Sequence, residues 1–326
     1  MVKSERLFNL EGSYAAKLIE HYSRSNLRNY PKPFVYKLAS DNRFVEERTR
    51  LERLFERYKA ALENHPRRED IIKDKLGRFW EEDRQHFGAY YELETFDFLK
   101  SCQVPFSIEP DTPQGGRPDF RIDQPPILVE VATVFDIEEF EKREHTANQI
   151  LQALRSIQNQ NLELRIHECL PQVNSCQIEK LKKRIHDWVA SNQAGSIMLK
   201  LEVEGIAITV IRHEQPVRIE SKPVTPFNPD LIEKVLYRKS CKYQGPLLIA
   251  LGIHQWPINI IYPEITQLVN EATKRKRING LLIIEPEWRQ PLVRSCQYYL
   301  FCDPSRIDPT IFAGNCQIID VTKTPR

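Results

Sequence analysis

Glycine is scarce in this sequence, with 11 glycines among 326 residues. No GxGxxG, Walker-type or GxSxG motif occurs, so the chain lacks the loops by which nucleotide-binding proteins and serine hydrolases are recognised. It also lacks any apolar run near the roughly 20 residues that span a membrane, and its first residues do not resemble a signal peptide. We therefore expect no membrane partner.

Cysteines are few and dispersed, without a CxxC motif or a close cysteine–histidine pair: the seven lie at positions 102, 169, 176, 241, 296, 302 and 316. An odd and scattered number argues against a disulfide framework and a zinc site. It is typical of reduced thiols in a cytoplasmic protein. The net charge of +2 indicates no particular partner, so nucleic-acid binding would depend on local groups of basic residues.

What the sequence does contain is an ordinary globular composition, 41% hydrophobic and 28% charged. Its length allows one large domain or two ordinary ones. Helical and strand-like apolar patterns both occur along it, which indicates the mixed α/β class. Apolar residues recur at helical steps over 44–62 and 68–86, and Gly88 separates these helices from another at 90–99, with Glu92 at the edge of its apolar stripe.

The middle of the chain has the pattern of a β-hairpin. A break at Gln124-Pro125-Pro126 separates two runs of alternating apolar residues, 119–122 and 127–132, and proline does not continue a strand ladder. A tight turn at this break places Asp119 opposite Glu130. Directly opposed residues in such a pair have Cβ atoms roughly 4.5–5.5 Å apart.

Two carboxylates at that distance repel each other unless a proton or a cation lies between them. A hard divalent ion with oxygen ligands suits the gap. The alternative is that both acids are solvated on an exposed strand face, with the register shifted by one residue. The alternation also puts Val129 and Val131 on one face of the strand, and Leu128, Glu130 and Ala132 on the other.

Further elements are expected after this hairpin. They are a long helix over 136–161, a second hairpin over 197–210 that turns at Glu204-Gly205, and a proline-marked linker over 217–227. A helix that starts at Asn228-Pro229 carries Lys234, Arg238, Lys239 and Lys242. The apolar run that follows it is typical of a strand buried on both faces. Strands near residues 248, 282 and 299, separated by one helix, predict parallel βαβ pairing.

One family resemblance rests on the order of three short segments: Glu92 on a helix, then Pro118-Asp119-Phe120, then an apolar strand with Glu130-Val131-Ala132. Over residues 90–160 this order resembles the PD-(D/E)xK nuclease superfamily. The resemblance implies a restriction-endonuclease-like αβββαβ core. We therefore expect an α/β fold with a helical N-terminal arm over 1–86, this core over 87–215, and additional C-terminal strands and helices over 216–326 that pack on the same sheet.

The resemblance also implies a chemistry, the hydrolysis of phosphodiester bonds, in DNA more than in RNA. Asp119 and Glu130 would bind Mg²⁺ or Mn²⁺, the carbonyl of Val131 would add a ligand, and Glu92 would be an accessory acid. A bound metal ion neutralises charge in the transition state and generates a nucleophile near neutral pH, which is what this reaction needs.

The superfamily's lysine belongs two residues after the second acid, and Ala132 stands there. Three interpretations remain. The lysine has moved to the following helix, where Lys142 is the nearest candidate and Arg143 or Gln149 could assist; the metal suffices alone; or the site is inactive and the fold serves nucleic-acid binding or scaffolding. An α/β protein unrelated to nucleases, with merely exposed acids, is the further alternative.

Overall fold

The computed structural model divides the chain into two compact units: unit 1 contains residues 1–135 and 227–326, and unit 2 contains residues 136–226. The residues described are 6–8, 16–17, 19–20, 34–81, 83–113, 115–134, 146–147, 149–151, 153–154, 162–168, 173–191, 198–204, 206–213, 220–221, 229–253, 258–275, 277–288 and 294–323. Unit 2 is therefore an insertion within unit 1, entered after the strand that carries Glu130.

Unit 1 is built on a seven-stranded mixed sheet with the order β1-β2-β3-β8-β9-β10-β11. The strands are β1 (Phe106–Ile108), β2 (Phe120–Asp123), β3 (Pro126–Val134), β8 (Leu247–Ile253), β9 (Gly280–Trp288), β10 (Arg294–Cys302) and β11 (Gln317–Asp320). The first three form an antiparallel meander, whereas β3, β8 and β9 are parallel neighbours. Strand β10 then runs antiparallel to β9 and parallel to β11.

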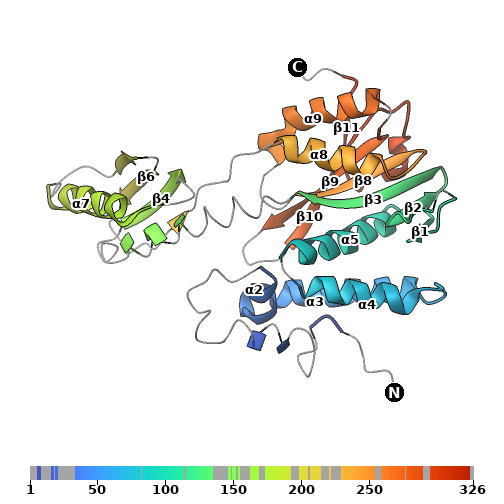
Figure 1. Ribbon diagram of the computed structural model, residues 1–326, viewed down its shortest axis with the longest axis horizontal. Helices are drawn as coiled ribbons and strands as arrows, with labels where there is room; N and C mark the ends of the chain where they lie inside the picture. Colours follow the sequence, from blue (N-terminus) through green and yellow to red (C-terminus); the bar gives the residue numbers. More distant parts are fainter. Residues whose placement is uncertain are drawn as a thin grey trace. The chain divides into compact units, whose positions relative to one another are not determined.

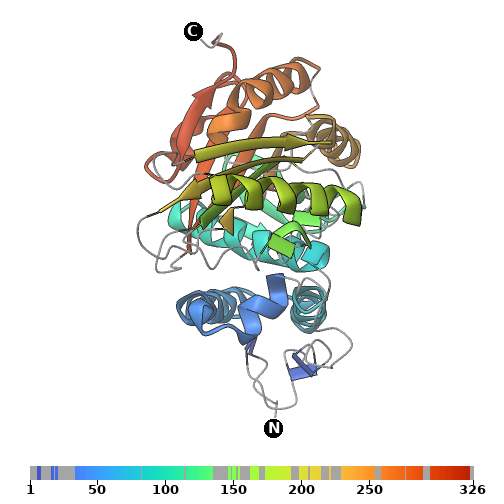
Figure 2. The ribbon, with the colours of Figure 1, turned by 90° about the vertical axis from the view of Figure 1, so that its left-hand side faces the viewer.

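Helices cover both faces of this sheet (Figure 1). Helix α5 packs against β3, β8 and β9 on one face, and α8 and α9 cover the other. The N-terminal helices lie outside α5, as a turned view also shows (Figure 2). The helices are α2 (Phe34–Ser40), α3 (Val45–Ala61), α4 (Arg68–Phe79), α5 (Asp83–Ser101), α8 (Pro229–Ser240) and α9 (Ile258–Lys274), with short 3-10 turns at Asn42–Phe44 and Pro309–Phe312.

Helix α5 differs from its prediction because it lies between two layers. It runs through Gly88, where the sequence predicts a break. Almost every side chain from Tyr90 to Leu99 is buried, so Glu92 lies in the interior and not at the edge of an apolar stripe. A helix that packs against a sheet on one side and against helices on the other needs no polar face.

The predicted hairpin is confirmed in register. A two-residue turn at Gln124 and Pro125, joined by a cis peptide bond, connects β2 to β3. The observed pairing of Phe120 with Val129 is the register that brings Asp119 opposite Glu130. The faces are also as predicted, because Val129 and Val131 lie in the core shared with α5, and Leu128 and Ala132 pack on the side of α8 and α9.

The predicted parallel βαβ unit is confirmed for β8, α9 and β9, whereas the strand near residue 299, β10, runs antiparallel to β9 because it follows β9 without a helical crossover. Because β8 also pairs with β3, these later strands continue the sheet of the hairpin. Within unit 1 the chain therefore follows the order α5, β1, β2, β3, α8, β8. Helix α8 is the connection that brings the chain back to the neighbour of β3.

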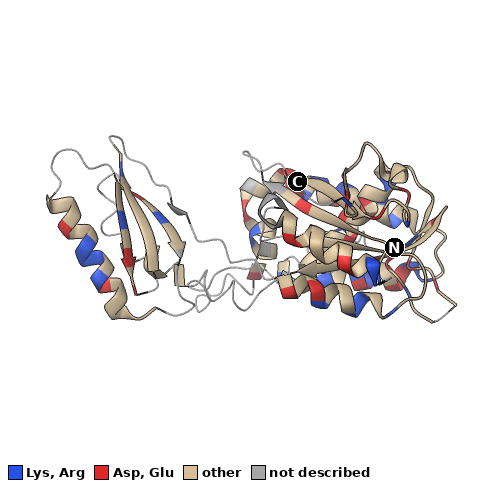
Figure 3. Cartoon of the chain, turned by 90° about the horizontal axis from the view of Figure 1, so that it is seen from above, with Lys and Arg blue, Asp and Glu red and all other residues tan. Residues whose placement is uncertain are grey.

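Unit 2 has its own four-stranded sheet with the order β5-β6-β4-β7. Its elements are β4 (Leu162–Glu168), α7 (Ser175–Ser191), β5 (Met198–Val203), β6 (Ile206–Arg212) and β7 (Glu220–Ser221). The hairpin predicted at Glu204 is present as β5 and β6. Lys and Arg residues are spaced along α7 (Figure 3), and the Nζ atom of Lys182 lies 2.7 Å from Oε1 of Glu179.

Residues 136–215, expected as part of the nuclease-like core, thus belong to a separate unit. The physical reason is that unit 2 buries its own apolar residues: one face of β4 packs with β6 and with Leu181, Ile185 and Trp188 of α7. The expected 136–161 helix falls mostly outside the described residues. No described helix is both long and apolar enough to cross a membrane, and the six described cysteines are free thiols.

Gly252 of β8 allows α5 to approach the sheet closely. A Cβ atom at Gly252 would lie 2.2 Å from the ring of Tyr91, which is fully buried. We expect Gly252→Ala to lower the free energy of unfolding by about 1–3 kcal/mol, the usual cost of overpacking a core. Urea unfolding followed by circular dichroism measures this change.

Gly77 of α4 provides the matched control, because no atom lies within 4 Å of the Cβ that alanine would add there. Gly77→Ala should raise the free energy of unfolding by roughly 0.5–1 kcal/mol, since alanine favours the helix. Equal unfolding midpoints for the two variants would show that Tyr91 is not held against the strand.

Candidate functional site

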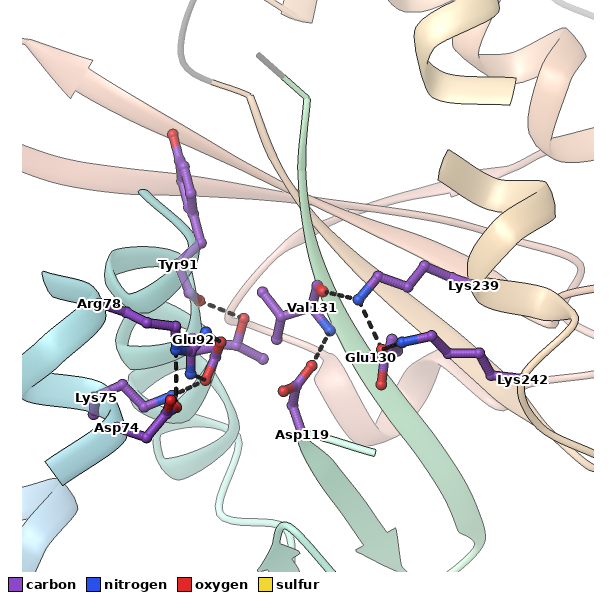
Figure 4. A network of polar contacts seen from close by, with 11 residues as sticks. Asp74, Lys75, Arg78, Tyr91, Glu92, Asp119, Glu130, Val131, Lys239 and Lys242 are labelled. Atoms are coloured by element: carbon purple, nitrogen blue, oxygen red, sulfur yellow. Dashed lines mark hydrogen bonds and ion pairs between the residues drawn. The ribbon is translucent and has the colours of Figure 1, made fainter. Parts of the chain in front are cut away.

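The three acids proposed from the sequence come from three elements of unit 1. Asp119 directly precedes β2, Glu130 lies in the middle of β3, and Glu92 lies on α5. In the close view Asp119 lies between the other two, with Glu130 toward α8 and Glu92 toward α4 (Figure 4). Each acid has its own partners, and these partners define what the site can do.

Glu130 is 4% exposed, and three side chains hold its carboxylate. Oε1 accepts hydrogen bonds from Nζ of Lys239 at 2.7 Å and from Nζ of Lys242 at 3.0 Å, and Oε2 accepts one from the Tyr243 hydroxyl at 3.0 Å. All three partners lie on α8 or directly after it. A buried carboxylate requires such compensation, because its transfer out of water is otherwise very costly.

Lys239 makes a second contact that distinguishes it from Lys242. Its Nζ also donates to the carbonyl oxygen of Val131 at 2.9 Å. The side chain of Lys239 is 15% exposed, whereas that of Lys242 is 49% exposed. Lys239 therefore brings a mostly buried positive charge to the face of β3 toward which Ala132 points.

Asp119 is tied to the same stretch of backbone. Its Oδ2 accepts a hydrogen bond from the Val131 amide at 2.7 Å. Part of the residue reaches solvent, but protein atoms crowd around the carboxyl group, and this burial, followed by the negative charge of Glu130, raises its pKa above the ordinary value of 3.8. The Val131 hydrogen bond and Lys75 act in the opposite direction.

Tyr243 connects Glu130 to the loop before β2. Its hydroxyl lies 2.9 Å from the carbonyl oxygen of Arg117 and 3.0 Å from Glu130 Oε2. A Cβ atom at Gly116 would lie 2.7 Å from the Tyr243 ring, so glycine is what lets this ring pack against the loop. Burial, followed by the charge of Glu130, raises the pKa of Tyr243, which keeps the hydroxyl a neutral donor.

Glu92 belongs to a second charged group, on the other side of Asp119. Arg78 of α4 binds it with two nitrogens, Nη1 to Oε1 at 2.6 Å and Nη2 to Oε2 at 3.2 Å, and Lys75 also contacts its carboxylate. Burial, followed by the positive charge of Arg78, lowers the pKa of Lys75 to about 7. These contacts hold Glu92 in an ion-pair network between α4 and α5.

The structure thus brings Asp119, Glu130 and Val131 together and gives Glu92 other partners. Among the described residues, no group of three or more His, Cys, Asp or Glu side chains is placed to hold a metal ion. Lys142 and Arg143 lie outside the described residues. Gln149 is exposed in unit 2.

Lys239, Lys242 and Tyr243 belong to the site although the sequence pattern did not predict them there. One feature of the sequence could have indicated the two lysines. They lie on or just after the helix that precedes the continuous apolar strand β8, and a helix that connects two strands of a sheet packs one of its sides against that sheet. Lys239 lies one turn after Leu236 and two turns after Ile232, the buried residues of α8. Lys75 and Arg78 had no such signal, since their pairing with Glu92 depends on how α4 packs on α5.

The oxygen atoms of this site are of the types that bind divalent cations. Two carboxylates and a backbone carbonyl are ligands that Mg²⁺ and Mn²⁺ accept, and water completes the coordination in such sites. A cation would also relieve the repulsion between Asp119 and Glu130. In this structure the positive charge at Glu130 and Val131 is the ammonium group of Lys239.

Comparisons with known proteins gave no match to this chain. No family model matches it. Searches of curated proteins and of solved structures also found no match. What the site can do must therefore be inferred from its own residues and contacts.

Asp119→Asn should stabilise the protein at pH 8 by about 0.5–2 kcal/mol, the range of common stabilising substitutions. The raised pKa means that the folded state binds more protons than the unfolded state above about pH 4, so wild-type stability falls as the pH rises through that window. Asparagine does not titrate, and its Oδ1 can still accept from Val131. Urea unfolding at pH 8 and pH 4 measures the gain.

The gain should shrink as the pH falls toward 4, because protonation of Asp119 in the folded wild type removes the same repulsion that asparagine removes. Glu233→Gln is the control, because it removes an exposed carboxylate from α8 and should change stability by less than about 0.5 kcal/mol. A variant Asp119→Asn that is less stable than wild type at pH 8 would contradict the repulsion between Asp119 and Glu130.

Proposed function

We propose that this protein is a metal-dependent nuclease that hydrolyses phosphodiester bonds, with DNA as the expected substrate. The observation that carries the proposal is the position of Lys239, whose ammonium group lies 2.7 Å from Glu130 and 2.9 Å from the carbonyl oxygen of Val131. A lysine amine beside the second acid is what the PD-(D/E)xK resemblance requires and what Ala132 does not supply.

The order of elements supports the same proposal. Helix α5, the meander β1-β2-β3, helix α8 and strand β8 follow the order αβββαβ, and β8 pairs in parallel with β3. The restriction-endonuclease-like core proposed here therefore extends over these elements, with unit 2 inserted between β3 and α8. Asp119 and Glu130 occupy the two acid positions of the motif.

Lys239 takes the role of the absent strand lysine in this proposal. The side chain at position 132 points toward α8 and α9, and alanine is small enough to leave that space to a neighbour. Lys239 reaches Glu130 from α8, on that same face of the sheet. Lys142, the candidate of the sequence analysis, is the rival for this role.

The residues of the site divide the chemical work between them. Asp119, Glu130 and the Val131 carbonyl would hold Mg²⁺ or Mn²⁺, and such an ion, when bound, lowers the pKa of water and stabilises negative charge on phosphate. Lys239 would orient the attacking water or neutralise a phosphate oxygen. Tyr243 fixes the orientation of Glu130.

Three partly exposed cations lie near the two acids of the site. Arg117 and Arg121 are each two residues from Asp119 in the chain, and Lys242 contacts Glu130. These cations would attract the nucleic-acid backbone.

One observation favours a second candidate, a catalytically inactive protein that binds nucleic acid or serves as a scaffold. The carboxylates of Glu92 and Glu130 are already compensated, the first by Lys75 and Arg78 and the second by Lys239 and Lys242. Such compensation allows the fold to persist without a metal. Activity measurements separate the two candidates.

We expect wild-type protein to cleave single-stranded or double-stranded DNA with Mg²⁺ or Mn²⁺, and RNA of the same sequences more slowly. Asp119→Ala, Glu130→Ala and Lys239→Ala should each lower the rate roughly 100-fold or more, because each removes a group that acts on the transition state. Gel assays of labelled substrates measure these rates, with a chelator to remove the metal.

Lys234→Ala is the matched control, since Lys234 is an exposed lysine of the same helix, and its rate should equal that of wild type. Lys142→Ala tests the rival lysine: a large loss there, with Lys239→Ala fully active, would move the role to Lys142. Binding of nucleic acid without cleavage of any substrate would favour the inactive scaffold.

A further inference from the structure

We propose that Lys239 is a resident counter-ion that a divalent cation must displace before it can bind. The inference rests on the proposed metal site, and it goes beyond that proposal by assigning Lys239 a second role. In the metal-free protein the lysine fills the site; in the metal-bound protein it is released. Metal affinity is then set by a residue that is not a metal ligand.

The geometry of the lysine contacts supports this competition. Nζ of Lys239 hydrogen-bonds to one carboxylate oxygen of Glu130 and to the carbonyl oxygen of Val131, two of the atoms that would coordinate the metal (Figure 4). An ammonium group that shares both oxygens leaves no room between them for a second cation. Two positive charges at such close range also repel each other in a site of low dielectric constant.

Lysine is suited to leave the site because four rotatable bonds separate its ammonium group from the helix. Lys239 lies in the last turn of α8, and its side chain is 15% exposed, so part of it already reaches solvent. A lysine at position 132 would have its backbone fixed in the sheet beside Glu130. A lysine on a covering helix can instead move from the carboxylate to a substrate phosphate.

A released ammonium group loses two hydrogen-bond partners and needs others. A phosphate oxygen of a bound nucleic acid is a strong charge-assisted acceptor for it. Substrate therefore compensates the lysine at the moment when metal displaces it, and metal and nucleic acid should strengthen each other's binding. Such coupling is reciprocal, so the same factor applies in both directions.

Lys242 provides an internal comparison. Its ammonium group also contacts Oε1 of Glu130, at 3.0 Å, but the structure shows no contact between it and the Val131 carbonyl, and 49% of its side chain is exposed. Removal of Lys242 takes away a similar charge near the same carboxylate. If metal affinity rises more when Lys239 is replaced than when Lys242 is replaced, the difference is due to the oxygens that Lys239 shares with the metal and not to the loss of a positive charge alone.

The experiment measures Mn²⁺ binding without nucleic acid, by the electron paramagnetic resonance signal of the free ion and by calorimetry. Lys239→Met should bind Mn²⁺ at least about tenfold more tightly than wild type, which corresponds to about 1.4 kcal/mol. Lys242→Met should show a smaller gain, and Lys234→Met, on the exposed side of α8, none. Circular dichroism confirms that each variant is folded.

Lys239→Gln is the second variant, in case Lys239→Met does not fold, because its amide still donates a hydrogen bond but carries no charge. It too should bind Mn²⁺ more tightly than wild type. Equal or weaker binding by the folded Lys239 variants, or no Mn²⁺ binding by any variant, would overturn the displacement. If the wild type cleaves DNA with metal but the Lys239 variants bind Mn²⁺ no more tightly than wild type, the displacement is refuted and the nuclease function stands.

The same measurements can also support the displacement of Lys239 while contradicting the nuclease function. If the Lys239 variants bind Mn²⁺ more tightly but the wild type cleaves no nucleic acid, the displacement stands and the nuclease function fails. Addition of a non-cleavable phosphorothioate oligonucleotide to the wild type should strengthen Mn²⁺ binding, and it should do so less in Lys239→Met. Equal strengthening in both proteins would exclude phosphate as the new partner of the lysine.

Discussion

A carboxylate in the middle of a sheet requires a positive charge beside it, and this requirement organises unit 1 around Glu130. The charge comes from α8, whose last turn places Lys239 over β3. Helix α8 packs on this face through Ile232 and Leu236, and the C-terminal end of the helix also brings Lys242 and Tyr243 to the same carboxylate. Helix packing and the chemistry of the site are therefore one arrangement, held by charge as well as by apolar contacts.

Charge compensation also explains how the two faces of the sheet differ. On the side of α5, Glu92 is paired inside a helical layer by Arg78 and Lys75, where it ties α4 to α5. On the side of α8, Glu130 is paired by flexible lysines near solvent. Asp119 lies between the two groups, with a hydrogen bond only from a backbone amide among the described residues. Asp119, the acid with the least positive charge beside it, therefore lies next to the flexible Lys239 and Lys242 side chains. This is a suitable place for a metal ion from solution to bind.

The sequence predicted those features that depend on neighbours along the chain. Pro125 and the alternation around it determined the register of β2 and β3, and the apolar strands around α9 predicted the parallel unit of β8 and β9. It failed where distant segments meet: Glu92 is interior because α4 packs on α5, and Lys239 lies 109 residues after Glu130. The local pattern over β5 and β6 likewise predicts a hairpin, but it does not tell which sheet these strands join.

The insertion of unit 2 between β3 and α8 has a consequence for synthesis on the ribosome. Glu130 leaves the ribosome well before Lys239, since 109 positions separate them in the chain. At about 5–20 residues per second this separation lasts roughly 5 to 20 seconds. During that time β3 carries an uncompensated carboxylate and lacks its neighbour β8, so the central sheet cannot close. Unit 2, whose strands and helix are contiguous in sequence, can fold first, and the candidate site is completed only when α8 and β8 emerge.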